Sequence, residues 1–182
     1  MQLIITHAEA TNENGLGPCY RITQSSAAGT ELYILPRSAL AGDMEMYGVD
    51  DPLHVLDWRL YGYRGEQLPA PDAEPSLRLV ADAQQVQALA EYGRARLASG
   101  LVAEHTRASL ADDLDQLDTN ADELKEEARR LREAEIAAIK ETVHITEDDG
   151  LVALRALVLA DLDDITADQT RYRAQLAAAI TA

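Results

Sequence analysis

A repeat of apolar residues between Ala103 and Ile145 constrains this chain more than any other feature. The stretch contains neither proline nor glycine, and its apolar residues recur at alternating steps of four and three. They are Leu110, Leu114, Leu117, Ala121, Leu124, Ala128 and Leu131. A 3.5-residue repeat keeps one narrow stripe turned toward a partner helix, so the pattern predicts a long helix with coiled-coil character. The other faces carry mostly Asp, Glu and Arg, which makes this helix an acidic rod.

Two further helices are expected in the second half of the chain. Residues 77–98 show helical spacing, and Ser99 and Gly100 either break the chain before the long helix, 103–145, or lie within it. Residues 149–181 carry a second apolar stripe, and the acidic turn before Gly150 suits a helix start. We expect 149–181 to fold back on 103–145 as an antiparallel hairpin.

A hairpin of this length buries only a narrow seam, so we expect the stalk to form a homo-oligomer. Exposed apolar stripes usually mark binding sites. The predicted oligomer interface comprises Leu110, Leu114, Leu117, Leu124, Leu131, Val158, Leu162, Ile165, Tyr172 and Leu176.

The N-terminal third has the composition of a small β structure. Residues 2–7, 19–24 and 30–35 are rich in β-branched and apolar residues and are separated by turn-forming segments. Residues 53–63 alternate with a period of two and predict another strand, with Trp58 as a structural aromatic at the centre of the core.

These patterns predict an α+β fold in three parts. Residues 1–65 form an antiparallel β module, residues 66–76 a proline-rich linker, and residues 77–182 a helical stalk. Three of the six prolines fall within the predicted linker, which favours an extended spacer.

Charge limits the partners that such a chain can bind. The formal net charge is -16, and acidic residues outnumber basic ones on both sides of the linker. Neither part can neutralise phosphates efficiently, which disfavours direct binding to nucleic acid or to an anionic membrane. The first residues lack a basic segment followed by an apolar run, and no apolar stretch reaches membrane-spanning length, so we expect neither a signal peptide nor a transmembrane segment. We therefore expect protein partners, including other copies of the chain, and a location in the cytoplasm or in an assembled particle.

Three short motifs resemble metal or acid sites but lack essential parts. Residues 118–122 match the start of a calcium loop, although Glu123 and Arg129 replace its glycine and its bidentate glutamate. The Glu141 to His144 spacing matches half of a di-iron site, and no second Glu-x-x-His occurs. Residues 161–164 carry three aspartates, which we expect to form a solvated acidic face.

No local pattern indicates a nucleophile. Cys19 lies in an expected strand, and the four histidines are scattered. The sequence therefore predicts no catalytic, cofactor-binding or metal-binding residues, and no enzyme.

The favoured hypothesis is a non-enzymatic structural or interaction protein, an oligomeric adaptor that combines a docking β module with a coiled-coil stalk. Such an arrangement is used in virion and tail components, an analogy of fold only. One alternative is an acidic decoy or inhibitor of a nucleic-acid-binding protein, suggested by the acidic rod. Another is an assembly chaperone that holds a partner on apolar helical faces.

Overall fold

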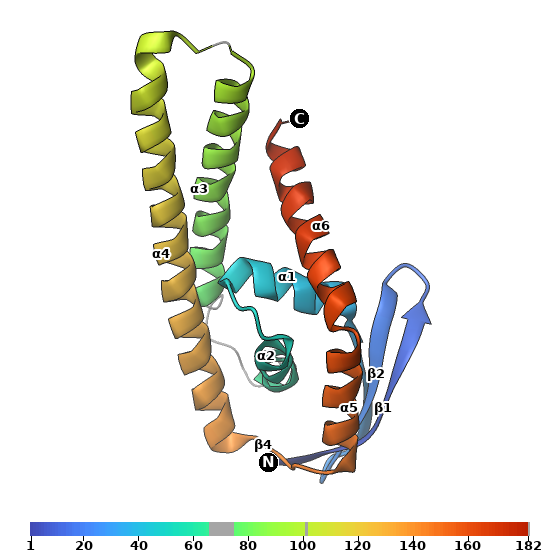
Figure 1. The fold of residues 1–182 in the computed structure, drawn as a ribbon. Coiled ribbons are helices and arrows are strands. Elements are labelled where there is room, and N and C mark those ends of the chain that lie inside the picture. The colour runs from blue at the N-terminus through green and yellow to red at the C-terminus, as the bar shows by residue number, and fades with distance from the viewer. Residues whose placement is uncertain (66–74, 101, 182) are drawn as a thin grey trace.

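The computed structural model describes residues 1–65, 75–100 and 102–181, and it shows an α+β fold (Figure 1). The strands β1 (Gln2–Glu13), β2 (Gly17–Ser26) and β3 (Gly29–Pro36) form an antiparallel meander, as the sequence predicts. A two-residue strand, β4 (His144–Ile145), adds to β1 in parallel and gives the order β3-β2-β1-β4. The α+β class and the N-terminal antiparallel strands are confirmed.

The second half of the predicted β module is helical. Two helices, α1 (Arg37–Tyr47) and α2 (Pro52–Gly65), follow the meander, so the strand predicted over residues 53–63 is wrong. Val55, Leu56, Trp58 and Leu60 are all at most 3% exposed. At 100° per residue these four side chains span more than half of the circumference of α2. A helix buried on several faces loses its one-sided 3.6-residue pattern, and the remaining alternation resembled a strand.

The long acidic helix exists but has a different partner from the one predicted. Its helix, α4, spans Glu104–Thr142 and packs along its length against α3 (Pro75–Ala98), with the connecting loop at the end away from the sheet (Figure 1). Small residues bring these two helices close together. A Cβ atom added to Gly93 would lie 2.3 Å from Leu114 Cδ2. Gly100, at φ 73°, ends the turn after α3, so the chain does break before the long helix.

The C-terminal segment is two helices and not one arm of the hairpin. Helix α5 (Asp149–Ala160) packs on β1, and α6 (Leu162–Thr181) packs on α1 and α3. The predicted hairpin between 103–145 and 149–181 is therefore wrong. The short parallel pairing of β4 with β1 ties the chain to the sheet edge after α4. Gly150 then allows a very close approach, because a Cβ atom there would lie 1.6 Å from the Ile5 carbonyl oxygen.

One hydrophobic core joins the sheet to the helices. It includes Ile22 from β2, Leu56 from α2, Val80 from α3, Ile136 from α4 and Leu154 from α5. Most of the predicted linker, residues 66–74, lies outside the described residues, and Pro75 already begins α3. The strands and the helices thus pack on one another, with α1 crossing the middle of the body (Figure 1).

Candidate interaction surface

The residues predicted to form the oligomer interface do not share one surface. Leu114, Val158 and Ile165 are buried inside the chain, and Leu162 is exposed. Tyr172 approaches α1, where a Cβ atom added to Gly42 would lie 3.8 Å from its ring, and its hydroxyl contacts Gln84 of α3. The half-buried members are Leu110, Leu117, Leu124, Leu131, Tyr172 and Leu176. Only the α4 members remain candidates for a common face.

The apolar stripe of α4 divides into two rows. Leu114, Ala121 and Ala128, seven residues apart, are at most 4% exposed. The second row, Leu110, Leu117, Leu124 and Leu131, stays half-buried. The first row is thus fully covered by the rest of the chain, while the second lies at the edge of the contact with α3 and keeps part of its apolar surface in water.

Helix α3 of the same hairpin also carries an exposed apolar residue, Leu89. Its side chain is 59% exposed, the largest exposure among the large apolar residues described. Since α3 runs antiparallel to α4 and Gly93 lies against Leu114, Leu89 is level with the part of α4 between Leu117 and Leu124.

Helical geometry places these residues on the side of the hairpin away from α1 and α6. On α3, Gln84 reaches α6 at Tyr172, and Leu89 is five residues, or 140°, further around the helix. On α4, Lys125 reaches α1 at Glu45, and Asn120 is likewise 140° away. We call this side, with Leu89, Leu117, Asn120 and Leu124, the outer face of the hairpin.

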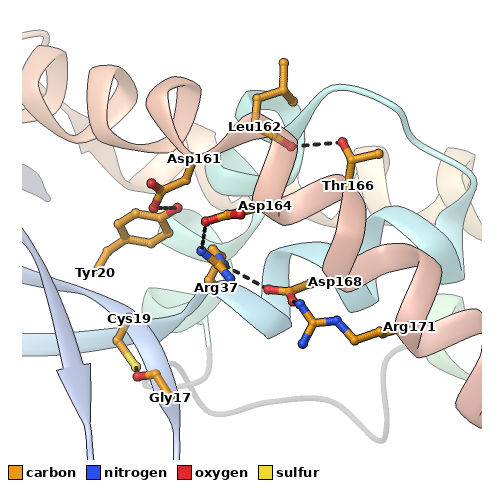
Figure 2. A network of polar contacts seen from close by, with 10 residues as sticks. All are labelled: Gly17, Cys19, Tyr20, Arg37, Asp161, Leu162, Asp164, Thr166, Asp168 and Arg171. Atoms are coloured by element: carbon orange, nitrogen blue, oxygen red, sulfur yellow. Dashed lines mark hydrogen bonds and ion pairs between the residues drawn. The ribbon is translucent and has the colours of Figure 1, made fainter.

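The polar side chains near the body of the fold are largely paired with one another. Figure 2 shows Tyr20 Oη donating to Asp161 Oδ2 at 3.0 Å, while Arg37 donates to Asp168 Oδ2 at 2.8 Å and to Asp164 Oδ2 at 2.7 Å. Burial, together with the Asp161 carboxylate, raises the pKa of Tyr20 well above its usual range. Residues 161–164 are therefore not simply a solvated face, because Asp161, between α5 and α6, binds β2 and Asp164 of α6 binds α1.

A second polar cluster surrounds Glu45 on α1, whose side chain is 3% exposed. Arg173 Nη2 of α6 donates to it at 2.6 Å, Gln169 Nε2 donates at 3.4 Å, and Lys125 Nζ of α4 lies 3.7 Å away. Burial alone would raise the pKa of Glu45, but Arg173 and Lys125 hold it below its ordinary value. This carboxylate joins three helices and is occupied by internal partners.

The motifs that resembled metal or acid sites lie in ordinary structural positions. The calcium-like segment lies within the uninterrupted helix α4, and its first residue, Asp118, pairs with Arg94 of α3. His144 lies in β4, beyond the end of α4 at Thr142, so it does not share a helical face with Glu141. Over the described part of the chain, no group of three or more His, Cys, Asp and Glu residues is arranged to hold a metal ion.

The histidines and the cysteine are dispersed over the fold. His54 packs edge-on against Trp58, with ring centroids 4.8 Å apart, and lies 3.6 Å from Glu133. His7 is exposed on β1. Cys19 is buried, with its Sγ 3.2 Å from the Gly17 carbonyl oxygen. None of the described helices is both long enough and apolar enough to cross a membrane.

Comparisons with known protein families, curated proteins and solved structures found no match for this chain. The functional argument therefore depends on the geometry and charge of the described residues.

Sequence reasoning found the half-buried α4 row but missed Leu89 and the polar fastening of α6. In the sequence, Leu89 is simply one more apolar residue within the helix expected over residues 77–98. Its exposure becomes meaningful only once α3 is known to be the partner of α4, because Leu89 then lies beside Leu117 and Leu124.

Proposed function

We propose that this protein is a non-enzymatic structural or interaction protein that self-associates through the α3–α4 hairpin. In this proposal the strands and the helices α1, α2, α5 and α6 form the base, and the hairpin is the arm through which copies join. The expected role is that of an oligomeric adaptor, as in virion or tail assemblies.

The observation that carries the proposal is the exposed apolar surface on the outer face of the hairpin. Leu89 is 59% exposed and lies level with two half-buried leucines of α4. Apolar residues aligned on one helical face are typical of an association surface. Their alignment distinguishes them from the single exposed apolar residues that are normal on protein surfaces.

The polar clusters support a structural role for the base. Arg37, Glu45 and Arg173 bond with partners from other helices, which leaves these side chains engaged in holding α6 to α1. Carboxylates held in this way serve packing and orientation, since buried charged groups require paired partners.

The direct test is the mass of the wild-type protein in solution over a range of concentrations. Size-exclusion chromatography with light scattering should give at least twice the 19.9 kDa chain mass at micromolar concentrations. A protein that stays at one chain mass throughout would overturn the proposal. Such a monomer that also co-purifies with a basic partner would support the acidic decoy instead.

A further inference from the structure

We infer that two copies associate with α3 of one copy against α4 of the other, and with both hairpin loops pointing in the same direction. This inference rests on the proposed function and specifies its geometry. The partner is a second copy of this chain, and the contact is the outer face defined above.

The first argument is the fit of the apolar residues. If the two-fold axis runs along the hairpin, Leu89 of each copy faces α4 of its partner at the same level along the axis. Leu89 is level with the part of α4 between Leu117 and Leu124, so the exposed leucine of each copy meets the half-buried leucines of the other. This is the antiparallel helix packing already used within each chain, continued as a bundle of four helices.

The second argument is charge. Helix α3 carries three arginines and two acidic residues, whereas α4 carries six basic and twelve acidic residues. Placing α4 against α4 would bring together two strongly negative surfaces. Placing α4 against α3 brings a negative helix to a slightly positive one, and like-charge juxtaposition is the costlier choice.

The charges at the ends of the outer face follow the same pattern. Arg96 of α3 is three residues closer to the hairpin loop than Gly93, which lies against Leu114. Arg96 is therefore near the level of Asp113 on α4, and both side chains are exposed. In the proposed arrangement Arg96 of each copy faces Asp113 of the other. In the alternative, with a two-fold axis perpendicular to the hairpin, Asp113 would face the region of Glu127 in the second copy.

A consequence of this geometry is that both sheets lie at the same end of the dimer. Each sheet is at the end of its hairpin opposite the loop (Figure 1). A dimer with parallel hairpins would therefore present two copies of the base on one side, as a bivalent docking surface.

Disulfide trapping distinguishes the two arrangements. The background is the variant Cys19→Ser, because Cys19 is the single natural cysteine. One chain carries Gln85→Cys on α3 and a differently tagged chain carries Asn120→Cys on α4. Asn120 belongs to the outer face, and Gln85 lies one helical turn before Leu89, only 40° around α3 from it; both side chains are exposed. The two chains are co-expressed, purified without selecting mixed dimers and mildly oxidised, and the cross-linked products are distinguished by their tags.

The proposed arrangement brings position 85 of one copy close to position 120 of the other, so the mixed disulfide should be the main cross-linked product. The matched control is Thr119→Cys, an exposed position 100° further around α4, which should give no cross-link with position 85.

Other outcomes separate the geometry from the proposed function. A main product that joins position 120 to position 120 would overturn this arrangement and indicate α4 against α4. A dimer by light scattering that gives no cross-link would overturn the outer face as the contact, while self-association would stand. A monomer would overturn both.

Discussion

Replacing Glu45 by glutamine should destabilise the fold, because this buried carboxylate is the shared partner of α4 and α6. The substitution keeps the shape of the side chain but removes its charge. Lys125, whose side chain is 13% exposed, then loses its ionic partner in a mostly buried position, while Arg173, at 62% exposed, is well solvated. Breaking a buried pair typically costs about 3–5 kcal/mol, and exposed pairs contribute about 0–1 kcal/mol.

Since one partner is buried and the other is exposed, we expect Glu45→Gln to lower the free energy of unfolding by about 2–3 kcal/mol. For a chain of this size each kcal/mol corresponds to about 2–4 °C, so the melting temperature should fall by roughly 5–10 °C. Urea and thermal unfolding followed by circular dichroism would measure both quantities. The matched control is Glu127→Gln, whose partner Arg130 is on the exposed side of α4 and whose loss should leave the melt unchanged.

The same variant should change the dependence of stability on pH. Folding lowers the pKa of Glu45 below its ordinary value of 4.5. The group therefore contributes fully above that value, and its contribution fades as the pH falls toward the folded-state pKa. The variant should lose this acid-dependent component, so the two curves should converge below pH 4.5. Equal unfolding free energies at pH 7 would refute the role of Glu45 as a fastening between helices.

Two further changes test the base of the fold. Gly150→Ala should strongly destabilise the protein, because the new Cβ atom would meet the backbone oxygen of Ile5 at 1.6 Å, and circular dichroism should show a lower melting temperature or loss of folding. An unchanged melt would show that α5 does not sit this close to β1. Tyr20→Phe should remove one tyrosine that ionises late in a spectrophotometric titration, since burial and Asp161 hold the pKa of Tyr20 above its usual range. A titration curve identical to that of the wild type would contradict this assignment.

The sequence predicted those elements whose apolar residues face one direction. The strand near Ile22 and the α4 repeat from Leu110 to Leu131 each bury a single face, so their periods of two and 3.5 residues are visible along the chain. The sequence predicts a strand in place of α2, because the buried residues of this helix, including Leu56 and Trp58, point in several directions. Periodicity cannot distinguish such a helix from a strand over a short segment.

The sequence pattern does not identify α3 as the partner of α4, for a different reason. Helix α3 carries the small buried residues Ala83 and Ala90, and its Gly93 lies against Leu114 of α4. Such residues carry little weight in a hydrophobic pattern, although Gly93 allows close approach to α4. The attachment of α6 to α1 could not be predicted from local patterns, because its ionic pairs join residues far apart in sequence. Asp164 binds Arg37 across 127 positions, and no local pattern connects them.

The most direct test of self-association through the hairpin is sedimentation equilibrium of Leu89→Asp beside the wild type. Burying a leucine fully contributes about 1.5–3 kcal/mol, and the 59% that remains exposed corresponds to about 1–2 kcal/mol per copy. With two copies per dimer, the dissociation constant should rise by roughly 30- to 700-fold.

The control is Leu159→Asp, which adds the same charge at a 50% exposed leucine on α5. We expect Leu89→Asp to sediment as a folded monomer at concentrations where the wild type and Leu159→Asp are dimers. If Leu89→Asp instead keeps the mass of the wild type, the outer face of the hairpin is not the surface through which this protein associates.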